Sequence, residues 1–226
     1  MQDVTLISEH DGFRLGARHL PGRGSRKGGV VVLQEVFGVS AHIESVMVRL
    51  SSEGYETIAP SLFDRIAPNF TRPDDVDGLA AGIAAARSTP NVQAVADITA
   101  ALQYLVPGPK FAVGFCFGGV MAWLAAQYCE GLSGSICFYG RRIIDELDAP
   151  LIAPVMMHYG DRDANIPLSD VEVIQARYPA AEIHTYPAGH AFCREDGENY
   201  DLPFSDLAFA RTLRFMKDIG EAGGQS

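Results

Sequence analysis

The chain has 226 residues, of which 47% are hydrophobic and 20% are charged, and its formal net charge is −10. This length and composition predict one domain over residues 1–226, with ample material for a buried core. The acidic balance disfavours nucleic acid and anionic membrane surfaces as partners, and no apolar stretch reaches the roughly eighteen residues that a membrane span requires.

Short apolar runs alternate with segments of helical periodicity along the chain. The predicted strands lie at residues 4–8, 13–19, 29–34, 55–59, 111–113, 134–138, 155–158 and 182–186. The predicted helices lie at residues 41–53, 74–86, 91–105, 168–177 and 204–217, and Ser40 is expected to cap the first of them. The alternation predicts an α/β fold with a mainly parallel sheet and helices on both faces, a loop over 61–73 and a frayed tail over 220–226.

The four cysteines, Cys116, Cys129, Cys137 and Cys193, show no Cys-x-x-Cys spacing and are too few for a disulfide-built scaffold. The first residues contain no basic segment followed by an apolar core, so no secretory signal is expected. Reduced thiols and a cytoplasmic location are therefore the simplest expectation.

The most informative segment is residues 114–119, Gly-Phe-Cys-Phe-Gly-Gly, which lies between an apolar strand and an apolar helix over 120–126. The pattern is typical of a nucleophile elbow, with the thiol of Cys116 at the apex of a sharp turn that needs small neighbours. The N-terminus of the following helix would stabilise a thiolate there. Taken alone, the hexapeptide also fits a cysteine that is simply a small buried apolar residue.

An elbow thiol needs a base, and the base needs a group that orients it. Two later loops, each after a predicted strand, supply candidates at the carboxyl edge of the sheet. His190 is the expected base. Asp161 and Asp163 compete for the orienting role; Asp163 is preferred because residues 160–162 look like the turn itself, and a solvated turn aspartate is the alternative for either. The order of nucleophile, acid and histidine is that of an α/β-hydrolase.

Glu35 directly follows the buried run over residues 30–34, where a carboxylate is unfavourable unless it is paired or functional. An exposed loop glutamate is the alternative. If Glu35 lies near Cys116, its carboxylate can accept the thiol hydrogen. The backbone N–H of Val36 is then expected to form an oxyanion hole with that of Phe117.

Four segments together resemble the dienelactone hydrolases (carboxymethylenebutenolidases) over nearly the whole chain. They are residues 34–38 (Gln-Glu-Val-Phe-Gly), 114–119, 160–167 and 189–192, and residues 60–65 look like the family's Pro-Asp-Leu-Tyr segment. The resemblance implies the α/β-hydrolase fold, a Cys116–His190–Asp163 triad and Glu35 as a carboxylate that gates the thiol.

The same resemblance suggests groups that bind the substrate. Arg194, four residues after His190, matches a family arginine that binds the substrate carboxylate. The family's second such arginine lies before the elbow, where neither Arg72 nor Arg87 aligns clearly; Arg72 is kept as a candidate. Tyr139 resembles one of the family's two aromatic residues before glycine and is a further candidate, whereas the arginines at 141 and 142 are expected to be exposed loop charges.

The implied activity is that of a hydrolase that opens a carboxylated enol-lactone or ester through a cysteinyl acyl-enzyme, with a resting thiol that is neutral and hydrogen-bonded to Glu35. The expected partner is this small molecule, and the chain is expected to be a monomer or small homo-oligomer. No metal-ligand cluster or phosphate-binding glycine loop is visible, so no metal or cofactor is expected. Three alternatives remain: a carboxylesterase or thioesterase of broader specificity, a non-catalytic binding or redox-sensing protein on the same fold, and a cysteine elbow of the glutamine amidotransferase kind.

Overall fold

The computed structural model describes residues 1–223 and contains one eight-stranded sheet with the order β1-β2-β4-β3-β5-β6-β7-β8. Its strands are β1 (Gln2–Ile7), β2 (Arg14–Leu20), β3 (Gly28–Leu33), β4 (Tyr55–Pro60), β5 (Lys110–Phe115), β6 (Gly134–Phe138), β7 (Val155–Gly160) and β8 (Glu182–Tyr186). Strand β2 pairs antiparallel with β1 and β4, and all the other pairs are parallel. The predicted mainly parallel sheet is thus confirmed.

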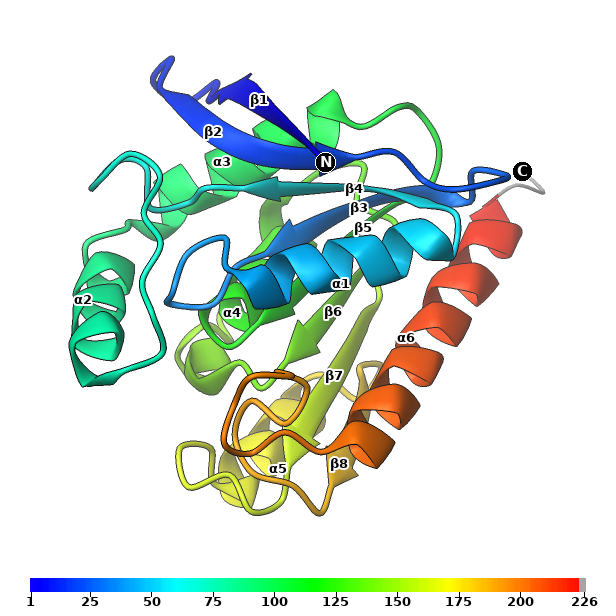
Figure 1. Ribbon diagram of the computed structural model, residues 1–226. Helices are drawn as coiled ribbons and strands as arrows, with labels where there is room; N and C mark the ends of the chain where they lie inside the picture. The colour runs from blue at the N-terminus through cyan, green and yellow to red at the C-terminus, as the bar shows by residue number, and fades with distance from the viewer. Residues whose placement is uncertain (224–226) are drawn as a thin grey trace.

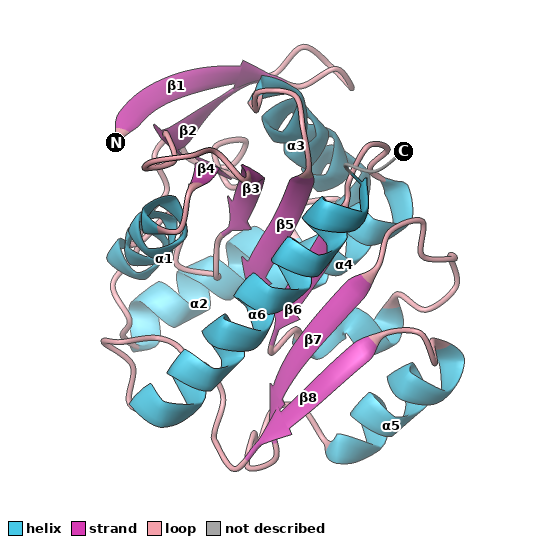
Figure 2. Ribbon diagram, turned by 90° about the vertical axis from the view of Figure 1, so that its right-hand side faces the viewer, coloured by secondary structure: helices cyan, strands magenta, loops and turns pink. Residues whose placement is uncertain are grey.

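The helices are α1 (Ala41–Ser52), α2 (Val76–Arg87), α3 (Asn91–Tyr104), α4 (Phe117–Tyr128), α5 (Leu168–Arg177), α6 (Leu202–Gly223) and the short 3₁₀ helix η1 (Arg141–Asp145). Helices α1 and α6 lie on one face of the sheet, and α3, α4 and α5 cover the other (Figure 1). Figure 2 shows the sheet between these layers, twisting from β1 to β8. This is the expected α/β-hydrolase arrangement.

Burial on both faces explains why the central strands are continuously apolar. All six residues of β3 and all six of β7 are buried, and the elbow strand β5 is buried from Phe111 onward. Among residues 1–223, no helix combines the length and the apolar character needed to cross a bilayer.

One predicted detail of α6 and one of α1 were wrong. Helix α6 continues to Gly223, so residues 220–223 are not a frayed tail; residues 224–226 lie outside the described part. The packing of Met216 and Ile219 against the core extends the helix beyond the point where its glycines predict an end. Ser40 does occupy the N-cap position of α1, but its hydroxyl makes no capping hydrogen bond.

The region that joins β4 to α2 determines one side of the site described below. Residues 61–73 contain turns and no regular strand or helix, as predicted. Helix α2 begins later than expected, after Asp75, whose carboxylate accepts a hydrogen bond from the N–H of Gly78 at 2.7 Å. In Figure 1, α2 stands apart from the two helical layers.

Candidate active site

Cys116 occupies the turn between β5 and α4 in a conformation that L-residues rarely adopt, with φ of 52° and ψ of −111°. Its N–H donates a hydrogen bond to the carbonyl of Phe138 at 3.0 Å, which ties the turn to β6. A non-glycine residue held in such a conformation is typical of a functional site. Its thiol is partly exposed.

Close backbone contacts explain the glycines of the elbow. A Cβ on Gly114 would lie 1.8 Å from the carbonyl oxygen of Gly118, and a Cβ on Gly118 would lie 2.2 Å from that of Leu33. Neither distance is sterically possible, so both positions need a residue without a side chain. The contact with Leu33 also places the end of β3 against the first turn of α4.

The thiol, an imidazole and a carboxylate lie in a row at this edge of the sheet. The Sγ atom of Cys116 is 3.4 Å from Nε2 of His190, and Nδ1 of His190 is 2.6 Å from Oδ2 of Asp163. The other oxygen of Asp163 accepts a hydrogen bond from the N–H of Asn165 at 2.8 Å. Asp161, the competing acid, is exposed, and its nearest cation is Arg162 at 3.9 Å.

The surroundings of His190 favour its protonated form. Burial alone would lower the pKa of His190, but hydrogen bonds with Asp163 and Cys116 outweigh burial and raise it to about 10. The imidazolium then donates from one nitrogen to the carboxylate and from the other to sulfur. This arrangement places a hydrogen-bond donor of the imidazolium on the sulfur of Cys116.

Glu35 is buried, but its carboxylate is not bonded to the thiol. Oε2 of Glu35 lies 3.6 Å from Nη1 of Arg194 and has no hydrogen-bond partner within residues 1–223. Burial raises the pKa of Glu35 to about 7, although the positive charge of Arg194 partly offsets this. The hydrogen bond expected between the resting thiol and Glu35 is therefore not formed in this structure, in which the thiol faces His190.

Arg194 is surrounded by negative charge and is nearly inaccessible, with a side chain that is 5% exposed. Besides Glu35, its Nη1 contacts Oδ2 of Asp74 at 3.2 Å, and its Nε donates to Oδ1 of Asp196 at 2.8 Å. The guanidinium also lies over the ring of Phe37, 4.5 Å from its centroid. Arg194 is thus placed beside Glu35, but three carboxylates of the chain already contact it.

Two backbone N–H groups near the elbow are free to bind an anion. Within residues 1–223, the amides of Val36 and Phe117 donate no hydrogen bond. Phe117 is the first residue of α4, where an N–H normally lacks a partner in its own helix. Val36 follows the backbone that packs against Gly118. These are the two groups expected to form an oxyanion hole.

The ring of Tyr139 packs against the imidazole of His190. Tyr139 is fully buried, and the two ring centroids lie 5.2 Å apart in an edge-to-face arrangement. The backbone of Tyr139 has a positive φ of 40°. The buried hydroxyl has no hydrogen-bond partner in the described part of the chain. Most buried hydroxyl groups are hydrogen-bonded, so this unpaired group is an exception.

One known protein family matches most of the chain. The model of the "Dienelactone hydrolase family" matches residues 15–220. The chain belongs to this family. It is 32% identical over 212 residues to the "Putative carboxymethylenebutenolidase" of Escherichia coli K12, covering 84% of this chain and 77% of that protein. It is 31% identical over 237 residues to the "Carboxymethylenebutenolidase" of Pseudomonas sp. strain P51, covering 96% and 97%.

A solved structure gives the same result. The crystal structure of the "Putative Dienelactone Hydrolase" from Klebsiella pneumoniae superposes with a TM-score of 0.78 at 27% identity, covering 95% of this chain and 98% of that one. This chain is therefore a hydrolase of the dienelactone hydrolase type.

The arginines that the family resemblance left open all lie on the surface. Arg72 is exposed, its guanidinium lies over the ring of Phe70 at 4.4 Å, and no carboxylate within residues 1–223 pairs with it. Its backbone N–H donates to the carbonyl of Phe37, which places it close to the segment that carries Glu35. The arginines at 141 and 142 are exposed on η1, as expected.

Sequence reasoning missed two residues beside the candidate site, Asp74 and Asp196. Asp74 precedes α2 and belongs to a stretch expected to be a helix start, and Asp196 follows Arg194 by two residues. Neither lies in a motif, and acidic side chains are common in this chain. Only the spacing of Asp196 to Arg194 offered a local signal.

Proposed function

We propose that this chain hydrolyses an ester or lactone through an acyl-enzyme on Cys116. The observation that carries the proposal is the row formed by Sγ of Cys116, the imidazole of His190 and the carboxylate of Asp163, with contacts of 3.4 and 2.6 Å, at a strained turn. A redox sensor has no need of the orienting carboxylate, which argues against that alternative.

In the first step the thiolate attacks the carbonyl carbon of the substrate. A carbon–sulfur bond forms, and the N–H groups of Val36 and Phe117 hold the negative charge on the carbonyl oxygen. When the carbon–oxygen bond breaks, Nε2 of His190 gives its proton to the departing alkoxide. An enolate leaves readily, so an enol-lactone needs little of this assistance.

In the second step the neutral imidazole acts as a base. Asp163 holds Nδ1–H, so that Nε2 faces the thioester and takes a proton from an attacking water. The carbon–sulfur bond breaks, a carboxylic acid leaves, and the proton on Nε2 again faces the thiolate. Water supplies the oxygen, and no other reactant is consumed.

Glu35 is proposed as an alternative acceptor for the thiol proton. Its carboxylate changes protonation near neutral pH, because its pKa is raised to about 7 by burial. Attraction to Arg194, 3.6 Å away, competes with a bond to sulfur. The substrate itself is proposed from the relatives named carboxymethylenebutenolidase, which suggests an enol-lactone.

A carboxylesterase of broader specificity is the second candidate. One observation favours it, since Arg194 already contacts three carboxylates and is nearly inaccessible to another. Exposed Arg72 is then the remaining candidate for contact with a substrate carboxylate.

The test is rapid-mixing kinetics with p-nitrophenyl acetate, with mass spectrometry of the quenched protein. We expect a burst of p-nitrophenolate and an acetyl group on the peptide that contains Cys116. The Cys116→Ala variant should lose both, whereas Cys129→Ala, which removes a buried thiol at the end of α4, should keep them. Unchanged turnover by Cys116→Ala would refute the proposal.

A further inference from the structure

The carboxylates around Arg194 differ in how firmly they are held. Glu35 is buried on the loop after β3, whereas Asp74 and Asp196 are 44% and 63% exposed. Asp74 nevertheless contacts Nη1 of Arg194 at 3.2 Å, closer than Glu35 does at 3.6 Å. The partly exposed carboxylate of Asp74 and the buried carboxyl group of Glu35 thus contact the same guanidinium nitrogen of Arg194.

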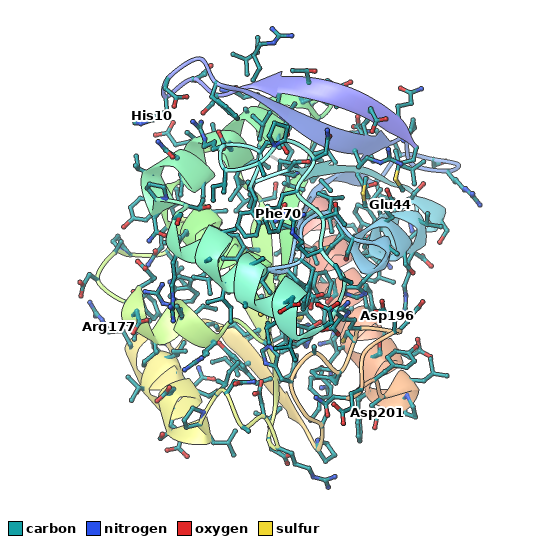
Figure 3. The ribbon with its side chains drawn as sticks, turned by 60° about the vertical axis from the view of Figure 1, so that its left-hand side comes forward. His10, Glu44, Phe70, Arg177, Asp196 and Asp201 are labelled. Carbon is teal, nitrogen blue, oxygen red and sulfur yellow. The ribbon has the colours of Figure 1, made fainter. Side chains whose placement is uncertain are left out.

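The position of Asp74 is fixed by the start of α2. The next residue, Asp75, caps this helix through Gly78, and a Cβ on Gly78 would lie 2.0 Å from the carbonyl oxygen of Pro73. The backbone on both sides of Asp74 is therefore anchored. Figure 3 brings the left-hand side of Figure 1 forward, so that α2 faces the viewer, and Asp196 is labelled in the same view.

We propose that Asp74 is a specificity-determining residue: its carboxylate occupies Arg194 and selects uncharged esters and lactones over substrates that carry a carboxylate on the acyl side. The inference rests on the proposed function. A substrate carboxylate that approached Arg194 would meet the charges of Asp74 and Asp196 around the same cation, with the carboxyl group of Glu35 beside them. It would have to displace Asp74, because like charges at such distances repel.

The experiment compares two p-nitrophenyl esters with the same leaving group, the acetate and the hemisuccinate. In Asp74→Asn, the KM for the hemisuccinate relative to that for the acetate should fall about tenfold, a change equal to about 1.4 kcal/mol. The ratio of the kcat values should not change. Asp77→Asn is the matched control, because Asp77 lies in the first turn of α2 and the variant has the same net charge. Its KM ratio should equal that of the wild type.

Binding of succinate, followed by calorimetry, tests the inference without turnover. Succinate should bind about tenfold more tightly to Asp74→Asn than to the wild type or to Asp77→Asn. Equal binding by all three proteins, or a wild-type preference for the hemisuccinate, would overturn the role of Asp74. Failure of the wild type to hydrolyse either ester would instead refute the proposed function, and the binding result would still decide the role of Asp74.

Discussion

The thiol side of the site, formed by Cys116, His190 and Asp163, and the guanidinium side, formed by Arg194 with its carboxylates, lie at one edge of the sheet. Backbone contacts hold the thiol side, where a Cβ at Gly118 would lie 2.2 Å from a carbonyl oxygen. Ion pairs hold the guanidinium side, and two of its carboxylates are substantially exposed. A steric constraint fails on almost any substitution, whereas an ion pair can be exchanged with little movement of the backbone. Substitutions on the guanidinium side can therefore be made with little disturbance of the thiol side.

Replacing Gly118 by alanine should have the largest effect on stability, because the added Cβ would overlap the backbone of β3. The new Cβ would also lie 2.6 Å from the carbonyl oxygen of Gln34, so β3 and α4 must move apart. We expect the free energy of unfolding to fall by more than about 4 kcal/mol, measured by urea denaturation. Gly220→Ala is the control, since its Cβ would lie 3.8 Å from Pro109. Equal stability of the two variants would show that close packing does not hold the thiol side.

Replacing Asp163 by asparagine should leave the turn in place and remove the group that orients His190. We expect kcat to fall about 10³-fold, with the thioester accumulating because the water is no longer activated. Single-turnover kinetics with mass spectrometry separate the two steps. Asp161→Asn, at the exposed aspartate two residues earlier, should change kcat less than about twofold. A similar loss in both variants would contradict the assignment of Asp163.

The thiol side was accessible to sequence reasoning, because each of its residues follows a strand that is recognisable by its apolar run. Parallel strands bring such loops to one edge, so Cys116, His190 and Asp163 were expected together before any geometry was known. The same rule placed Glu35 at that edge. The sequence could not show that Glu35 faces Arg194 rather than sulfur, since the order of strands and loops does not fix the direction of a side chain.

The guanidinium side was not accessible in this way. Asp74 reaches Arg194 because of the path of an irregular loop and the later start of α2, and neither has a periodic signal. The end of α6 was mispredicted for a related reason, since tertiary packing outweighed the weak helix propensity of glycine. Long-range side-chain pairs and helix ends both depend on contacts between distant parts of the chain.

Replacing Glu35 by glutamine tests the buried charge on the guanidinium side. The folded pKa of Glu35, about 7, is above its ordinary value of 4.5, so the native state binds more protons between these values. Its contribution to stability is therefore complete below pH 4.5 and is lost as the pH rises through 7. We expect the wild type to lose about 2–3 kcal/mol between pH 5 and pH 8 relative to Glu35→Gln.

Urea denaturation of both proteins at several pH values gives this difference. Glu172→Gln, at an exposed position on α5, is the control and should keep the pH dependence of the wild type. Parallel curves for the wild type and Glu35→Gln would mean that Glu35 is ionised in the folded protein at all these pH values. The guanidinium side would then be held by full charges throughout.

Replacing Tyr139 by phenylalanine should have the smallest effect on stability. It tests what the buried hydroxyl next to His190 contributes. The change removes a buried hydroxyl that has no partner and keeps the ring contact with His190, so the protein should become more stable by about 1 kcal/mol. Tyr159→Phe is the matched control, because the Tyr159 hydroxyl is also buried and unpaired within residues 1–223. If Tyr139 contacts the substrate, only Tyr139→Phe should raise KM for p-nitrophenyl acetate. An unchanged KM would limit Tyr139 to packing against the imidazole, and the unpaired hydroxyl would then be a cost in stability without a return in binding.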